Sequence, residues 1–128
     1  MTATKKKKIR LEYGVRTSPA LLFNYISSPS GLSNWFCNDV DVYNNQFKFK
    51  WDSEENIAEL IKKVNNKLMR FRWLDSKPDE YFEFEIIVDE LTDDVALVIT
   101  DFVMPEDEKN TSSLWESQVH DLKASLGA

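Results

Sequence analysis

Aromatic and charged residues alternate along several segments in the middle of the chain. The pattern is clearest at residues 47–51 (FKFKW), 69–73 (MRFRW) and 82–88 (FEFEIIV). Successive side chains of a β-strand point to opposite faces, so each segment predicts a strand with one aromatic face and one charged face. Because a sheet with an aromatic face cannot leave that face in water, the chain must supply a second layer to cover it.

The segment at residues 110–126 is the one stretch long and apolar enough to form that layer. Its large apolar residues follow the i, i+4, i+7, i+11 spacing that places side chains on one stripe of an α-helix. These residues are Trp115, Val119, Leu122 and Leu126. The sequence therefore predicts a long C-terminal helix that lies against the sheet.

Local signals predict where this helix begins and ends. Ser113 followed three residues later by Glu116 is a capping-box pattern, which is typical of a helix N-terminus. Gly127 follows the last apolar residue and suits a left-handed C-terminal cap. These signals predict a helix of at least about a dozen residues, near 20 Å long.

The N-terminal part of the chain predicts one strand followed by two short helices. Residues 9–15 alternate between apolar and polar, as in a half-buried strand. Ser18-Pro19 and Ser28-Pro29 each offer an N-cap followed by a first-turn proline, and the second start leads toward Trp35. Because proline cannot continue the helix before it, two such starts predict two separate helices.

From residue 36 onward the pattern predicts six antiparallel strands joined by short turns. The apolar residues of 57–64 are split between both parities, and residues 95–99 are apolar throughout, as in a strand covered on both sides. Turn residues separate the strands at 44–45, 52–55, 65–66, 75–79 and 92–94.

The predicted fold class is α+β, with the element order β-α-α-β6-α. In this helix-grip arrangement a curved antiparallel sheet wraps around the long C-terminal helix, with a cavity between them. We expect a single domain over residues 1–128, with residues 1–8 as a flexible basic tail.

Composition limits the classes of partner. The 128 residues carry a net charge of −6, and without Lys5 to Lys8 the rest of the chain carries −10, which would repel phosphates. No apolar run approaches the length of about 18 residues that a membrane span needs. We therefore expect a cytoplasmic protein that binds no nucleic acid and does not associate stably with membranes.

Residues able to support catalysis are scattered. His120 is the only histidine and falls on the face of the helix opposite its apolar stripe, and Cys37, the only cysteine, has no neighbouring cation. Glu83 and Glu85 belong to the charged face of their strand, where cross-strand basic residues can pair with them. No metal-ligand spacing and no Gly-rich phosphate loop occurs, so we expect no catalytic residue, metal site or cofactor.

The large aromatic residues have two interpretations. They either fill a packed core or line a cavity, with indole N–H groups and polar residues at the edge of the stripe as anchors. The sequence leaves the choice open. The candidates for a ligand pocket are Trp35, Phe49, Trp51, Phe71, Trp73, Phe84, Trp115, Gln118, Val119 and Leu122.

The order of several short motifs resembles a known superfamily. The motifs are the opening alternating strand, GLSNWF at Gly31–Phe36, RFRWL at Arg70–Leu74, and LWESQVHDLKASLG at Leu114–Gly127. In this order they resemble the START-like, helix-grip superfamily and, within it, the branch of the Aha-type activator of the heat-shock-protein-90 ATPase. Small START-like proteins of Bacteroidetes are especially similar.

The resemblance implies the helix-grip fold and the function that is usual in this superfamily, which is the binding of apolar or amphipathic small molecules. We therefore predict a non-enzymatic binding module that encloses such a molecule between the sheet and the C-terminal helix. A co-chaperone-like domain that binds a protein partner is the alternative. A cavity enzyme is a third possibility, because some relatives catalyse cyclisation or hydrolysis.

Overall fold

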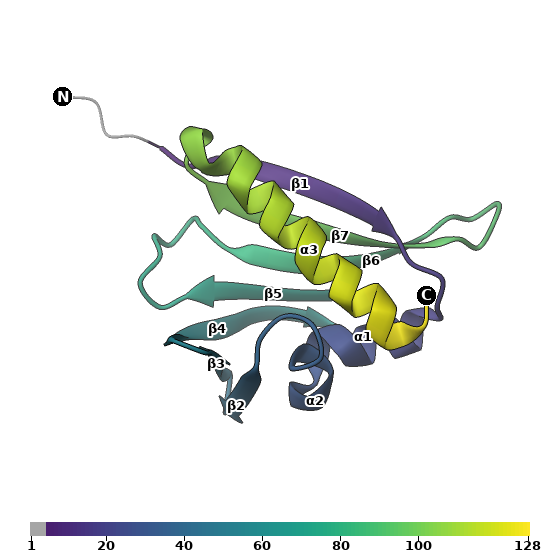
Figure 1. Cartoon of the computed structure of the whole chain (residues 1–128), viewed down its shortest axis with the longest axis horizontal. Coiled ribbons are helices and arrows are strands. Elements are labelled where there is room, and N and C mark those ends of the chain that lie inside the picture. Colours follow the sequence, from purple (N-terminus) through teal and green to yellow (C-terminus); the bar gives the residue numbers. More distant parts are fainter. Residues whose placement is uncertain (1–4) are drawn as a thin grey trace.

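The computed structural model describes residues 5–128 and shows a curved antiparallel sheet with helices against one face (Figure 1). The predicted order β-α-α-β6-α is confirmed, with a short 3-10 turn added before the last helix. The elements are β1 (Lys7–Gly14), α1 (Pro19–Ser27), α2 (Pro29–Leu32), β2 (Asp39–Tyr43), β3 (Gln46–Trp51), β4 (Glu54–Val64), β5 (Leu68–Trp73), β6 (Phe82–Val88), β7 (Val95–Val103), the 3-10 turn η1 (Pro105–Asp107) and α3 (Glu108–Leu126).

The sheet has the strand order β1-β7-β6-β5-β4-β3-β2, and every neighbouring pair is antiparallel. Strands β2 to β7 form a meander, and the last strand, β7, also pairs with the first strand, β1. Figure 1 shows α3 crossing one face of this sheet, with α1 and α2 on the same side. The predicted α+β helix-grip fold is confirmed.

Both Ser-Pro helix starts are confirmed. The Ser18 hydroxyl oxygen accepts a hydrogen bond from the Leu21 amide at 3.1 Å, and the Ser28 oxygen accepts one from the Gly31 amide at 3.0 Å. In each case the proline occupies the first turn. Each serine thus satisfies an amide that the helix itself leaves without a partner.

The two short helices meet through direct backbone contact at Gly31. A Cβ atom at this position would lie 2.3 Å from the Asn24 carbonyl oxygen and 2.6 Å from the Tyr25 Cα. The indole N–H of Trp35 then donates to the Tyr25 carbonyl at 2.8 Å. These contacts fix the loop that presents Phe36 to the sheet.

The irregular pattern of residues 57–64 has a structural cause. The register between β4 and β5 shifts between Leu60 and Lys62, which marks a β-bulge. Ala58 pairs with the inward-facing Trp73 before the shift, whereas Lys63 pairs with the inward-facing Met69 after it. The inward parity therefore changes within one strand, and no single alternation describes it.

The start of α3 differs from the prediction. The helix begins at Glu108, directly after η1, so Ser113 and Glu116 lie inside the helix and the predicted capping box was wrong. Pro105 at the first position of η1 presets the backbone for a helical turn, and the following acidic residues suit the positive end of a helix. The C-terminal prediction is confirmed, because Gly127 adopts φ 71°.

The predicted flexible tail over residues 1–8 is too long. Lys7 and Lys8 belong to β1 and pair with Val103 and Phe102 of β7, because the ladder with β7 extends that far. Lys7 also forms an ion pair of 2.7 Å with Glu108 at the start of α3. Residues 1–4 of the predicted tail lie outside the described residues.

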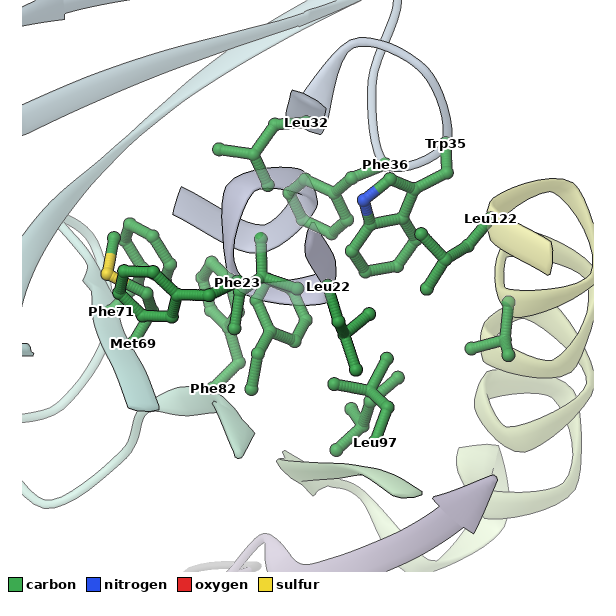
Figure 2. Close-up of a cluster of buried hydrophobic side chains, with 14 of the residues drawn as sticks. Leu22, Phe23, Leu32, Trp35, Phe36, Met69, Phe71, Phe82, Leu97 and Leu122 are labelled. Atoms are coloured by element: carbon green, nitrogen blue, oxygen red, sulfur yellow. The ribbon is translucent and has the colours of Figure 1, made fainter. Parts of the chain in front are cut away.

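The core lies between the sheet and the helices. Figure 2 shows Leu22 and Phe23 of α1, Phe71 and Phe82 of the sheet, and Leu122 of α3 directed into one buried cluster. Strand β7 is buried on both parities, as predicted for residues 95–99. On the outer face Arg70 pairs with Glu83 at 2.7 Å, as expected for the charged side of the sheet.

Candidate ligand-binding pocket

A pocket of about 550 Å³ lies between one end of the sheet and the N-terminal half of α3. Five aromatic rings and one leucine supply its apolar surface, and six polar side chains complete it. The lining residues are Phe36, Trp51, Ser53, Glu54, Asn56, Trp73, Phe82, Asp101, Thr111, Leu114, Trp115 and Gln118.

The antiparallel meander explains why these residues meet. The ends of β3, β5 and β7 and the starts of β4 and β6 all fall at the same edge of the sheet. Trp51 and Trp73 are the last residues of β3 and β5, and Phe82 is the first residue of β6. Trp73 stacks on Phe82 with ring centroids 4.8 Å apart.

The Phe36 carbonyl joins three parts of the pocket wall. It accepts hydrogen bonds from the indole N–H of Trp51 at 2.9 Å and from the side-chain amide of Gln118 at 3.0 Å. The Phe36 ring also stacks on Trp115, with centroids 5.7 Å apart and planes 10° apart. The loop after α2, strand β3 and helix α3 are thereby held together around the pocket.

Asp101 is a carboxylate on the largely apolar inner face of the sheet. Its Oδ2 accepts a hydrogen bond from the Trp115 indole N–H at 3.0 Å, and its Oδ1 accepts one from the Phe102 amide at 2.8 Å. Burial raises the pKa of Asp101 above its ordinary value of 3.8, although these two hydrogen bonds and the charge of Lys6 oppose the rise. Desolvation thus disfavours the ionised form of this carboxyl.

A smaller cavity of about 250 Å³ adjoins the pocket on the side of η1. Trp73, Asp101 and Thr111 line both spaces, so Asp101 lies at their junction. Lys6 and Glu80 line the smaller cavity and form an ion pair with a 3.7 Å separation.

The structure separates the ten predicted candidates into three groups. Trp51, Trp73, Trp115 and Gln118 line the pocket. Trp35 lies instead beside an adjoining surface pocket of about 330 Å³, which shares Phe36, Trp51 and Gln118 with the first. The remaining five are packed in the buried core cluster, and these are Phe49, Phe71, Phe84, Val119 and Leu122.

Whether a candidate residue lines the pocket or packs in the core depends on its position along its helix or strand. Val119 and Leu122 belong to the C-terminal half of α3, where α1 and α2 supply enough side chains to fill the space. The pocket lies under the other half of α3. Both interpretations of the aromatic residues thus hold, each in its own part of the molecule.

Several lining residues were missed by sequence reasoning. Phe36 was overlooked because a loop residue carries no alternation signal, and Phe82 was assigned to the aromatic face of its strand but not to the pocket. Asp101 left only a partial signal, because it shares the parity of Val95, Leu97 and Ile99, but Val98 and Thr100 on the other parity are buried as well. A charged residue at an inward position of a strand is a candidate site residue.

The scattered reactive groups lie away from the pocket. His120 is exposed, as predicted. Cys37 is buried, and burial together with the charge of Asp39 raises the pKa of its thiol to about 12. Among residues 5–128, no group of three or more His, Cys, Asp and Glu residues is arranged to hold a metal ion. Within that same range, no helix combines the length and apolarity that a bilayer crossing requires.

A family model of the START-like superfamily domain matches residues 3–128. The chain belongs to the START-like superfamily. The superfamily predicted from the order of the sequence motifs is therefore confirmed. The comparison with curated proteins finds no match.

Solved structures resemble this START-like domain over nearly its full length. BfR322 from Bacteroides fragilis is 34% identical, with 95% of this chain and 92% of that chain covered and a TM-score of 0.67. The Aha1 dimer from Colwellia psychrerythraea is 17% identical, with 94% and 96% covered and a TM-score of 0.79. DynU16, from the dynemicin biosynthetic locus, is 14% identical, with 94% and 47% covered and a TM-score of 0.80.

The likeness to the two proteins of low identity concerns the fold alone. The Bacteroides fragilis protein shares both fold and family with this START-like domain. The predicted similarity to Bacteroidetes START-like proteins is thereby confirmed, and the predicted similarity to Aha-type proteins is confirmed for the fold.

Proposed function

We propose that this START-like domain binds an apolar or amphipathic small molecule between the end of the sheet and the N-terminal half of α3. The pocket of about 550 Å³ supports the proposal. Sites for small molecules are typically clefts of about 300 to 1,000 Å³ lined by aromatic side chains and a few placed polar groups.

The lining offers a rigid aromatic surface for such a molecule. Trp51 and Trp115 are held by hydrogen bonds, and Trp73 is held by stacking on Phe82. Leu114, which is 61% exposed, lies on the first half of α3 beside the opening. A ligand would remove this exposed leucine and the pocket faces of the indoles from water.

Screening by NMR and native mass spectrometry against lipids, sterols and aromatic compounds tests the proposal. We expect a bound complex that perturbs the indole N–H signals of Trp51, Trp73 and Trp115. Complete absence of bound mass and of shift changes across the library would overturn it.

A pair of variants links any binding to this pocket. Thr111→Phe places a ring at the lining, so it should abolish binding by filling the space. Ser113→Phe adds the same ring to an exposed position of α3 and should leave binding intact. Equal binding by both variants would place the ligand elsewhere.

Acid–base catalysis is a second candidate function, and Asp101 is the observation that favours it. A carboxyl whose pKa is raised by burial inside a pocket is a candidate for proton transfer. The test is turnover of a ligand found in the screen, followed by mass spectrometry for the wild type and Asp101→Asn. Recovery of the ligand unchanged from the wild type would end this candidate.

A protein-interaction role of co-chaperone type rests on the likeness to the Aha1 dimer and on the net charge of −6, which favours a basic partner. The direct measurement is the ATPase rate of a heat-shock-protein-90 chaperone with and without the domain. An unchanged rate at excess domain would remove this candidate.

A further inference from the structure

Three of the hydrogen-bond donors around the pocket are already engaged within the protein. The indole N–H groups of Trp51 and Trp115 donate to Phe36 and Asp101, and the side-chain amide of Gln118 donates to Phe36. A ligand therefore meets mainly acceptors at these positions. This property concerns the pocket of the proposed function and rests on that proposal.

Asp101 keeps acceptor capacity for a ligand. A carboxylate offers about four lone-pair sites, and the Trp115 and Phe102 N–H groups occupy one on each oxygen. Asp101 lines both the pocket and the adjoining cavity. Lys6, which lines the adjoining cavity, pairs with Glu80 at 3.7 Å, and its charge also favours the ionised form of Asp101.

The charge of the lining has one sign. Asp101 and Glu54 are acidic, and the twelve described residues that form the pocket include no Lys, Arg or His. The aromatic faces add to this preference, because the ring quadrupole attracts cations, most strongly at tryptophan. Three of the four tryptophans of the chain line this pocket.

We propose that the pocket selects an amphipathic amine, whose ammonium group pairs with the Asp101 carboxylate while its apolar body lies among Trp51, Trp73 and Trp115. Glu54 adds negative charge to the same lining. A ligand with a carboxylate in place of the amine is disfavoured, because two like charges would share a partly desolvated space.

Three probes with one apolar body test the choice of head group. These are 4-phenylbutylamine, 4-phenylbutanol and 4-phenylbutyrate, titrated calorimetrically into the full chain at neutral pH. We expect the amine to bind at least about tenfold more tightly than the alcohol, since a hydrogen bond to a charged group is stronger than a neutral one. The carboxylate should bind most weakly.

Variants assign the preference to residues. Asp101→Asn should reduce the affinity for the amine to about that for the alcohol. Glu54→Gln should weaken amine binding by a smaller factor, and it removes no contact of α3. Glu55→Gln is the matched control, because Glu55 is exposed, pairs with Lys48 and lies outside the lining.

The outcomes separate this inference from the proposed function. Equal affinity for amine and alcohol, or tighter binding of the carboxylate, would overturn amine selection and leave a binding pocket in place. An amine preference that survives in Asp101→Asn would also overturn it. If none of the three probes binds, amine selection fails. The proposed function fails with it only if the wider library also yields no complex.

Discussion

The indole N–H of Trp115 on α3 donates to the carboxylate of Asp101 on β7 at 3.0 Å. This bond joins the helix to the inner face of the sheet beside the pocket, while the Trp115 ring stacks on Phe36. It gives a buried carboxyl a partner and holds the N-terminal half of α3 over the opening. The pocket wall and the Asp101 environment are therefore coupled.

Replacing Trp115 with Phe tests this bond. The variant keeps an aromatic ring against Phe36 but removes the N–H, so Asp101 loses one of its two donors. We expect the free energy of unfolding in urea to fall by about 1 to 3 kcal/mol. Leu114→Ala, at the neighbouring exposed position, should change it by less than about 0.5 kcal/mol. Equal losses in the two variants would contradict the role of the bond.

The raised pKa of Asp101 predicts a specific pH dependence of stability. The folded state holds the Asp101 proton more tightly than the unfolded state does. The contribution of Asp101 to the free energy of unfolding therefore falls as the pH rises from 3.8 through the folded pKa, and it is constant above that pKa. Asp101→Asn removes this dependence. In urea titrations from about pH 3.5 to 8, the stability of the variant relative to wild type should rise with pH and then level off. A relative stability that falls with pH would mean that the folded state favours the ionised carboxylate.

Gly31 should be intolerant of any side chain. A Cβ at this position would lie 2.3 Å from the Asn24 carbonyl oxygen, so Gly31→Ala must push α2 away from α1. We expect a loss of about 1 to 3 kcal/mol, as for other overpacked sites. Gly14→Ala is the control, because nothing lies within 4 Å of a Cβ there. In thermal melts, Gly31→Ala should have a clearly lower melting temperature than Gly14→Ala. Equal melting temperatures would show that the α1–α2 contact is loose.

Cys37 should resist thiol reagents in the folded protein. Its thiol pKa of about 12 leaves roughly one thiolate in ten thousand at pH 8, and the side chain is buried. Reaction with Ellman's reagent should therefore be very slow until denaturant is added, when the rate should become that of an ordinary cysteine. Rapid labelling without denaturant would show that the loop after α2 opens readily.

Several elements could be predicted from the sequence because their signals are local. The alternation of residues 47–51 and 69–73 corresponds to β3 and β5, and both Ser-Pro pairs begin helices. The spacing of Trp115, Val119 and Leu122 identified the buried stripe of α3. Each of these features depends on residues close together in the chain, so one sequence is enough to detect them.

Other features depend on tertiary context. The capping box at Ser113 was a valid local pattern, but Pro105 and the acidic turn after it begin the helix earlier. The bulge between Leu60 and Lys62 arises from pairing with β5, and the burial of Asp101 depends on α3. The extent of the pocket likewise depends on how far α1 and α2 fill the inner face.

The tryptophan indole N–H signals give the most direct test of the binding site, because the four residues act as probes and control in one spectrum. Trp51, Trp73 and Trp115 line the pocket, whereas Trp35 does not belong to its lining and donates its indole N–H to the Tyr25 carbonyl. On titration of the full chain with 4-phenylbutylamine, we predict saturable shifts of the first three signals and a nearly stationary Trp35 signal. Shifts confined to Trp35, or four stationary signals at saturating ligand, would contradict a site between the sheet and the first half of α3.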